Sequence, residues 1–298
     1  MKCLYVYNPT SGRQKNGKSA EYIKSRLLTK FDVVDVKPTK KRGDAGLYAL
    51  EACGKYDVLV VSGGDGTVNE VINAIAEHPQ KPKLGYIPTG TTNDLAHSLK
   101  IPKNIKKAVD IILGQHYIKH DIFKVNDRYG IYVCAFGLFS ASSYTASQKS
   151  KKKFGKLAYY VSGIKELSHA RKFPITLKTD LLEIESNVIL GIIANSKYVS
   201  GYKINKMADC SDGYVNVILF KERKKKGVSL KILLKIAKAF LFGIKTLKNS
   251  KDIVILKLNK FSVELSDKTV VNLDGESGFK GSFNLEVLKQ KVEICVRS

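Results

Sequence analysis

The sequence of 298 residues contains no tryptophan, only five cysteines and only seven arginines among its 51 basic residues. The cysteines are isolated, without a C-x-x-C pair or a histidine cluster, which argues against zinc sites and disulfide frameworks and for a reduced, cytoplasmic chain. The first apolar run is too short for a signal peptide, and no run of about 18 apolar residues follows. We therefore expect a chain that is neither exported nor membrane-spanning.

Acidic residues are also scarce, at 27 against 51 basic residues, which gives a formal net charge of +24. With 44% hydrophobic residues, the chain has enough apolar material for a core, and disorder is excluded. The excess positive charge is carried by lysine, a point-charge cation that suits a diffuse anionic surface better than the reading of base edges. The charge therefore favours a membrane surface as partner over nucleic acid.

The first part of the chain alternates strand-like and helix-like segments. Strands are predicted at 3–7, 33–37, 57–61 and 84–87, and helices at 18–28, 45–52, 68–76 and 94–99. This order predicts a doubly wound α/β domain, in which helices cover both faces of a parallel sheet. The segment 57–61 is almost continuously apolar, so we expect it to be buried on both faces.

After about residue 121 the pattern changes to short strands. They are predicted at 128–133, 175–179, 188–193, 214–220, 253–258, 262–265, 270–273 and 285–295, with helices only at 157–170 and 228–242. This predicts a second, mainly antiparallel β domain. We place the two domains at 1–125 and 126–298, where the net charges are +8 and +16.

Three polar loops follow strands of the predicted parallel sheet. They are Asn8-Pro9-Thr10-Ser11-Gly12, Gly63-Gly64-Asp65-Gly66-Thr67-Val68-Asn69 and the segment 88–96, which includes Thr91 and Asp94. Because the carboxyl ends of parallel strands gather at one edge, these loops should meet in one crevice. Glycines before a helix expose N–H groups to a phosphate, and an aspartate there needs a divalent cation between itself and the phosphates. Taken alone, G-G-D-G fits a glycine-rich turn with Asp65 as a helix cap as well as it fits a phosphate site, and each of the other loop features favours an ordinary turn or cap.

Taken together, the motifs N-P-x-S-G, G-G-D-G-T-x-N-E and P-x-G-T-x-N-D resemble the catalytic domain of the diacylglycerol kinase family, which includes bacterial soluble diacylglycerol kinases and sphingosine kinases. The resemblance continues through His120-Asp121, Ser211-Asp212-Gly213-Tyr214 and Leu273-Asp274-Gly275-Glu276, so it covers essentially the whole chain. It implies an NAD kinase/diacylglycerol kinase-like fold and an enzyme that transfers the γ-phosphoryl group of ATP to a lipid hydroxyl. Diacylglycerol, which would give phosphatidic acid, is the expected acceptor.

The resemblance also implies a role for particular residues. ATP would be bound by Asn8, Pro9, Thr10, Ser11, Gly12, Thr39, Gly63, Gly64, Asp65, Gly66, Thr67, Val68, Asn69 and Thr91. Asp65, Asp94 and Asp121 would form an acidic network that holds the catalytic Mg²⁺ through water. A second, structural Mg²⁺ would bind the Asp212 carboxylate and the carbonyls of Asp209 and Tyr214, although Asp212-Gly213 alone reads as a hairpin turn.

The base that accepts the proton of the lipid hydroxyl is expected in the turn Asp274-Gly275-Glu276. Glu276 matches the family's proton acceptor, and Asp274 is the alternative. The same three residues also read as an ordinary Asp-Gly turn with a solvated glutamate.

Lysines cluster at 149–156 and 221–226, and the second cluster precedes the largely apolar helix predicted at 228–242. Such a helix either packs on the β domain or lies at a bilayer interface, where nearby lysines attract anionic lipids. We expect a peripheral enzyme on the inner face of the membrane that does not bind nucleic acid. An exposed sheet edge leaves a homodimer open.

Three alternatives to a diacylglycerol kinase remain. The enzyme could phosphorylate another lipid, such as phosphatidylglycerol or a sphingoid base. It could be an NAD kinase, which shares G-G-D-G, although P-x-G-T-x-N-D argues against this. It could also be a non-catalytic lipid or nucleotide sensor on the same fold, against which Asp65, Asp94 and Glu276 argue.

Overall fold

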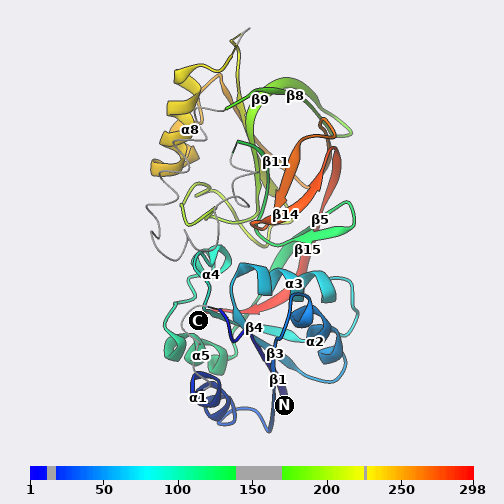
Figure 1. Ribbon diagram of the computed structural model, residues 1–298, viewed down its shortest axis with the longest axis vertical. Helices are drawn as coiled ribbons and strands as arrows, with labels where there is room; N and C mark the ends of the chain where they lie inside the picture. Colours follow the sequence, from blue (N-terminus) through cyan, green and yellow to red (C-terminus); the bar gives the residue numbers. More distant parts are fainter. Residues whose placement is uncertain (12–17, 139–169, 225–226) are drawn as a thin grey trace.

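The computed structural model describes residues 1–11, 18–138, 170–224 and 227–298 (Figure 1). In the first part of the chain, strands and helices alternate as the sequence predicts. These elements are β1 (Lys2–Tyr7), α1 (Lys18–Leu27), β2 (Val33–Pro38), α2 (Asp44–Ala52), β3 (Val58–Gly63), α3 (Asp65–Ile75), β4 (Lys83–Pro88), α4 (Asp94–Ser98) and α5 (Ile105–Gly114). The sequence analysis did not predict α5, although Asn104 caps it by accepting a hydrogen bond from the N–H of Lys107.

The four strands of this region form a parallel sheet in the order β2-β1-β3-β4. Helices α1 and α5 cover one face of the sheet, and α2 and α3 cover the other (Figure 1). All six residues of the central strand β3 are buried, as the continuous apolar run predicts. The doubly wound arrangement is therefore confirmed.

The second part of the chain is built mainly from antiparallel strands, also as predicted. It comprises β5 (Tyr117–Val125), β6 (Arg128–Gly130), β7 (Val133–Gly137), β8 (Phe173–Lys178), β9 (Glu183–Ala194), β10 (Val215–Lys221), α8 (Leu230–Phe242), the 3-10 helix η1 (Ile244–Leu247), β11 (Ile253–Leu258), β12 (Lys260–Glu264), β13 (Val270–Leu273), β14 (Glu276–Lys280) and β15 (Phe283–Cys295). Strand β14 was not predicted, because its first residue belongs to the turn Asp274-Gly275-Glu276. The helix predicted at 157–170 lies, apart from its last residue, outside the described residues.

Long strands connect the two regions. Strand β15 pairs antiparallel with β5 along most of its length, and its Ile294 lies beside Leu84 of β4. A single sheet therefore runs from the first region into the second. The expected domain boundary between 125 and 126 falls at the turn between β5 and β6, and it stays a prediction.

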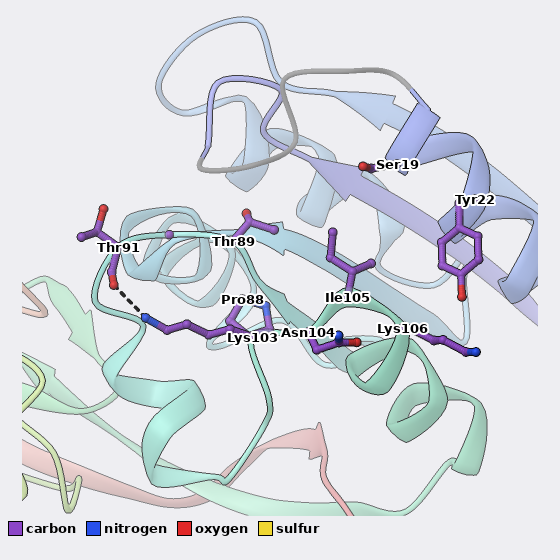
Figure 2. Close-up of a pocket in the computed structure, with 10 residues that line it drawn as sticks. Ser19, Tyr22, Pro88, Thr89, Thr91, Lys103, Asn104, Ile105 and Lys106 are labelled. Atoms are coloured by element: carbon purple, nitrogen blue, oxygen red, sulfur yellow. Dashed lines mark hydrogen bonds between the residues drawn. The ribbon is translucent and has the colours of Figure 1, made fainter. Parts of the chain in front are cut away.

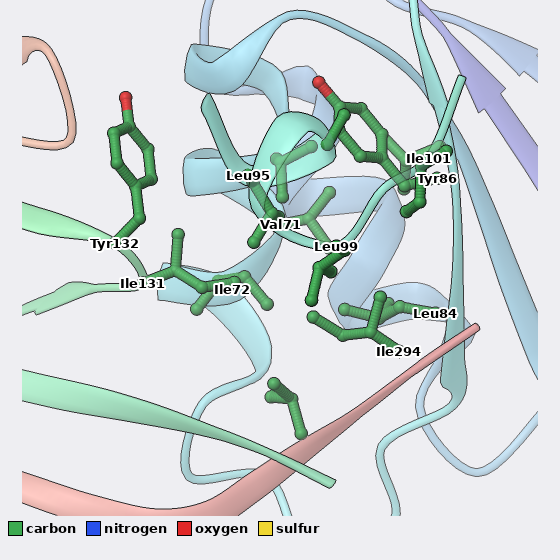
Figure 3. Packing of buried hydrophobic residues seen from close by; sticks show 14 of the residues in the cluster. Val71, Ile72, Leu84, Tyr86, Leu95, Leu99, Ile101, Ile131, Tyr132 and Ile294 are labelled. Atoms are coloured by element: carbon green, nitrogen blue, oxygen red, sulfur yellow. The ribbon is translucent and has the colours of Figure 1, made fainter. Parts of the chain in front are cut away.

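A shared hydrophobic core packs the junction between the regions. Side chains from α3, β4, α4 and β15 belong to one hydrophobic cluster with Ile131 and Tyr132, which precede β7 (Figure 3). A second cluster fills the interior of the antiparallel region and includes Phe123, Phe136 and Phe283. No helix among the described residues is long and apolar enough to cross a membrane.

Candidate active site

The carboxyl ends of the parallel strands meet at the junction, as the sequence predicts. The N–H of Asn8 donates to the carbonyl of Ser62, and the N–H of Thr89 donates to the carbonyl of Gly63, both over 2.9 Å. The hydroxyl of Thr89 also donates to the hydroxyl of Ser11 over 3.1 Å. The loops after β1, β3 and β4 therefore form one continuous polar surface.

Glycine is required where two of these loops touch. A Cβ atom built on Gly90 would lie 2.5 Å from the Cα of Gly64, so any larger residue would push the loops apart. Gly64 is also the N-cap of α3, and no side chain caps this helix. The first N–H groups of α3 are thus without a side-chain cap, and a helix N-terminus of this kind can bind a phosphate.

Asp65 opens α3, and its partly buried side chain contacts the loop after β4. Its Oδ2 accepts a hydrogen bond of 2.7 Å from the N–H of Asn93. Its Oδ1 is buried without a hydrogen-bond partner among the described residues. Burial raises the pKa of Asp65, against the effect of the nearby N–H groups. A buried carboxylate oxygen that accepts no hydrogen bond has its lone pairs free for a water molecule or a cation.

Asp94 joins the two regions of the molecule. Its two carboxylate oxygens accept hydrogen bonds of 2.6 Å from the N–H groups of Ser200 and Gly201, which lie in the turn between β9 and β10. The side chain is buried, and burial together with the charge of Asp65 raises its pKa to about 7. Asp65 thus lies close enough for its charge to disfavour ionisation of Asp94.

Asp274 is held even more tightly. Its oxygens accept hydrogen bonds from the N–H groups of Ile131, Tyr132 and Val133, over 2.8–3.0 Å, and from the amide of Asn69, over 2.8 Å. Burial raises the pKa of Asp274 to about 6, and these donors oppose the shift. Both oxygens of this carboxylate accept hydrogen bonds, and these bonds hold the turn at Asp274 against α3 and the start of β7.

Glu276, two residues later, is in a different environment. Its side chain is 44% exposed and forms an ion pair with Arg42, with an Oε2–Nη2 distance of 3.4 Å. Its Oε1 would lie 3.1 Å from a Cβ atom on Gly66, so the carboxylate faces the first turn of α3. Of the two acidic residues in this turn, Glu276 has the accessible oxygen atoms.

Asp121 lies in a different polar group. Its oxygens accept hydrogen bonds of 2.6 Å from the N–H groups of Gly213 and Gln290, and burial raises its pKa. The structure therefore places it against the segment 209–214, whereas Asp65 and Asp94 lie together. Its part in an acidic network with those two residues stays a prediction.

In the segment 209–214, the carboxylates contact protein groups. Asp209 accepts hydrogen bonds from the N–H and hydroxyl of Ser211, and Asp212 forms an ion pair of 2.7 Å with Lys257. Asp212 also accepts a hydrogen bond from the N–H of Tyr214. Across the described ranges, no group of three or more His, Cys, Asp or Glu side chains is arranged to hold a metal ion.

The other predicted ATP contacts that the structure describes lie at the same edge of the sheet, and they differ in which of their atoms can face a ligand. Thr39 follows β2 and donates its N–H to the carbonyl of Tyr7. The side chain of Val68 is buried in the core, so only its backbone can face a ligand. Asn69 uses its amide to hold Asp274, and Gly12 lies outside the described residues.

A pocket of about 610 Å³ opens beside the loop after β4, on the face of the sheet that α1 and α5 cover (Figure 2). Ser19 and Tyr22 of α1 line one side, and residues 103–106 at the start of α5 line another. Lys103 crosses toward the loop and donates a hydrogen bond of 2.8 Å to the carbonyl of Thr91 (Figure 2). The pocket therefore adjoins the loop after β4, which contains the predicted ATP contact Thr91.

Comparison with known proteins identifies the family of the chain. Residues 2–125 match the family model described as the diacylglycerol kinase catalytic domain, and residues 134–296 match the YegS C-terminal NAD kinase beta sandwich-like domain. The protein named diacylglycerol kinase from Staphylococcus carnosus (strain TM300) is 32% identical over 291 residues, which are 97% of this chain and 93% of that protein. The chain belongs to the diacylglycerol kinase family.

Further similar proteins support the same family. The protein named diacylglycerol kinase from Staphylococcus epidermidis (strain ATCC 12228 / FDA PCI 1200) is 33% identical and covers 97% of this chain and 90% of its own length. A crystal structure described as a diacylglycerol kinase from Bacillus anthracis str. Sterne has a TM-score of 0.82 and 28% identity, covering 99% of this chain and 97% of that one. The expected fold and the expectation of a kinase that acts on a lipid hydroxyl are thereby confirmed.

The sequence analysis missed several residues of this chain that shape the candidate site. Arg42 pairs with Glu276, and Tyr132 donates its hydroxyl to the carbonyl of Asp274 over 2.6 Å. Ser200 and Gly201 hold Asp94, and both have positive φ angles of 53° and 82°. The only local signal for this last pair was a Ser-Gly turn, which does not indicate its partner.

Proposed function

We propose that the protein transfers the γ-phosphoryl group of ATP to the hydroxyl of diacylglycerol, giving phosphatidic acid. The observation that carries the proposal is the position of Glu276, whose accessible carboxylate faces the first turn of α3. If the start of α3 binds the phosphates, the candidate base would lie opposite them at the junction. The names of the relatives, diacylglycerol kinase, support the choice of acceptor.

ATP would be held by the three converging loops and Thr39. The uncapped N-terminus of α3 favours negative charge, and the close contact of Gly64 with Gly90 brings the loop after β4 against it. In this arrangement the chain positions the phosphates mainly through its backbone, so the transferred group can be fixed without a large cluster of basic side chains.

Mg²⁺ is the expected companion of ATP, and the residues present fit it. The ion usually binds one or two carboxylates, and the substrate phosphates and water supply its other ligands. Asp65 offers a buried Oδ1 without a hydrogen-bond partner among the described residues, at the start of the helix that would face the phosphates. When bound, the ion would neutralise the negative charge of the transferred group. Asp94 lies close to Asp65, so its carboxylate would add negative charge near the same Mg²⁺.

The lipid hydroxyl must lose its proton as it attacks the phosphorus atom. Glu276 would accept that proton, since its oxygens are accessible and the Arg42 contact orients the side chain. Asp274, the alternative base, would instead position the turn, because its oxygens already accept hydrogen bonds from four N–H groups. This division of roles predicts that the two carboxylates respond differently to substitution.

The second Mg²⁺ site at Asp209, Asp212 and Tyr214 stays a prediction. Lys257 places its ammonium group beside the Asp212 carboxylate, where it supplies the positive charge that a cation would bring. A bound Mg²⁺ would have to displace this ammonium group.

A kinase assay over several acceptors tests the proposal. Radiolabelled ATP would be supplied with diacylglycerol, phosphatidylglycerol, sphingosine or undecaprenol in detergent micelles, with and without Mg²⁺. We expect label in phosphatidic acid, dependent on Mg²⁺. Preferred labelling of another lipid would correct the acceptor. A parallel reaction with NAD in place of the lipid tests for an NAD kinase, and no labelling of any acceptor would favour a sensor.

A further inference from the structure

Helix α8 exposes an unusual set of apolar side chains. Ile232, Ile236 and Ala239 are buried against the core of the molecule. Leu234 and Leu241, on the opposite side, are each 61% exposed. Leu230 is 71% exposed and Phe242 is 58% exposed. Large apolar residues that gather on one outward face usually mark a contact surface.

Lysines alternate with these apolar residues. The segment 228–250 contains five lysines and no acidic residue. Lys235 is turned toward Asp252 and forms an ion pair with it, whereas Lys231 and Lys238 are exposed. Because residues three or four apart share one side of a helix, these side chains form a single surface. We call this surface the α8 face: Leu230, Lys231, Leu234, Lys238, Leu241 and Phe242.

The alternation of leucine and lysine suits a lipid interface. Apolar side chains can enter the boundary of the acyl chains, while lysine ammonium groups remain at the level of the lipid phosphates. Helix α8 has 13 residues, which is too few to span a bilayer, so it would lie in the plane of the interface. A nucleic acid would pair with the lysines but leave the leucines in water. A bilayer accounts for both the lysines and the apolar residues of the α8 face.

Aromatic contacts connect the helix to the candidate site. The ring of Phe240 packs edge-on against Tyr202, with the ring centroids 5.6 Å apart. Tyr202 pairs with Val199, and the two residues between them donate to Asp94. Helix α8 therefore contacts, through Phe240, the turn that holds Asp94. Figure 1 shows the helix on the outside of the second region, toward the same flank as α4.

We propose that the α8 face docks the protein on a bilayer that contains anionic phospholipid. This deepens the proposed function, because it names the surface through which a lipid acceptor is reached. Docking by this face would place the acyl chains beside the turn that holds Asp94. It also gives part of the +24 net charge a specific use.

Vesicle sedimentation tests the proposal with two paired variants of the full chain. Vesicles of phosphatidylcholine, with and without phosphatidylglycerol, would be mixed with the parent protein, with Leu234→Gln/Leu241→Gln and with Lys231→Gln/Lys238→Gln. We expect the parent to bind only the anionic vesicles, and less at high salt. Each lysine removed should weaken binding about fivefold, and each leucine about tenfold.

Matched controls lie elsewhere on the surface. Leu181, at the turn between β8 and β9, is 98% exposed, so Leu181→Gln should leave vesicle binding unchanged. The exposed pair Lys30 and Lys55 serves the same purpose for charge, as Lys30→Gln/Lys55→Gln. Unchanged binding by both α8 variants, or an equal loss in the controls, would overturn the proposal. Equal binding of the parent to neutral vesicles would overturn the assignment of an anionic partner.

Activity in detergent micelles separates this proposal from the proposed function. The α8 variants should phosphorylate micellar lipid at the parental rate, because their substitutions lie outside the junction. If vesicle binding requires the α8 face but no lipid is phosphorylated, the docking surface stands and the proposed function fails. If micellar activity is normal and the α8 variants still bind vesicles, the proposed function stands and the docking surface fails.

Discussion

The acidic residues at the junction divide into two kinds. Asp94 and Asp274 are buried, and each accepts hydrogen bonds from backbone N–H groups of distant segments. Glu276 belongs to the same turn as Asp274 but is 44% exposed, and its partner is a single arginine. The difference suggests that the buried carboxylates hold the two regions of the molecule together while the exposed one is free to act on a substrate. Substitution of each kind can break or sharpen this comparison.

The largest expected effect is on catalysis. Glu276→Gln keeps the size of the side chain but removes its ability to accept a proton. We expect the rate of lipid phosphorylation to fall about 10²–10⁴-fold, the usual contribution of a general base. ATP binding and the midpoint of thermal unfolding should stay near the parental values, because the side chain is half exposed. Rates from radiolabelled ATP, together with nucleotide titration, measure the effect, and near-normal turnover would exclude Glu276 as the base.

The next effect is on stability. Asp274→Asn places a donor amide where an acceptor oxygen faces the N–H groups of Ile131, Tyr132 and Val133. Asparagine tolerates the positive φ of 51° at this position, so the backbone need not change. We expect the free energy of unfolding to fall by about 3 kcal/mol, since buried donors lose a charged acceptor.

Urea unfolding of Asp274→Asn, with Glu276→Gln as the control from the same turn, measures that difference. A stable Asp274→Asn protein without activity would contradict the assignment, because it would place Asp274 among the reacting groups.

The sequence predicts the general location of this site better than its internal roles. The order of strands and helices places the loops after β1, β3 and β4 at one edge, and the structure brings them together there. Spacing could not distinguish Asp274 from Glu276, because the donors that bury Asp274 come from residues 131–133, far away along the chain. The partners of Asp94 are equally remote. Contacts between distant segments depend on packing, which local patterns do not contain.

The same limit applies to helix α8. The one-sided pattern of the segment 228–242 predicts a helix with an apolar side, and the structure contains α8 at Leu230–Phe242. The pattern left open whether the helix packs internally or contacts a bilayer. The structure shows that Ile232 and Ile236 pack internally while apolar residues on the opposite side are exposed, and contact with a bilayer stays a prediction.

The smallest expected effect concerns the pH dependence of stability. The pKa of Asp94 is raised to about 7, chiefly by burial, whereas an aspartate in an unfolded chain has a value near 3.9. Between these two values the folded protein binds more protons at this site than the unfolded chain does. The contribution of Asp94 to the free energy of unfolding should therefore decrease as the pH rises through this window.

Asp94→Asn isolates that contribution, because asparagine does not titrate. Without Mg²⁺, the unfolding free energy of the parent minus that of Asp94→Asn should fall by about 2 kcal/mol between pH 5 and pH 7, from the linkage of the two pKa values. Urea unfolding at a series of pH values would measure it. A difference that stays constant, or that grows with pH, would show that Asp94 is ionised throughout. The turn at Ser200 and Gly201 would then bind a fixed negative charge, and the contrast between buried and exposed carboxylates would rest on hydrogen bonding alone.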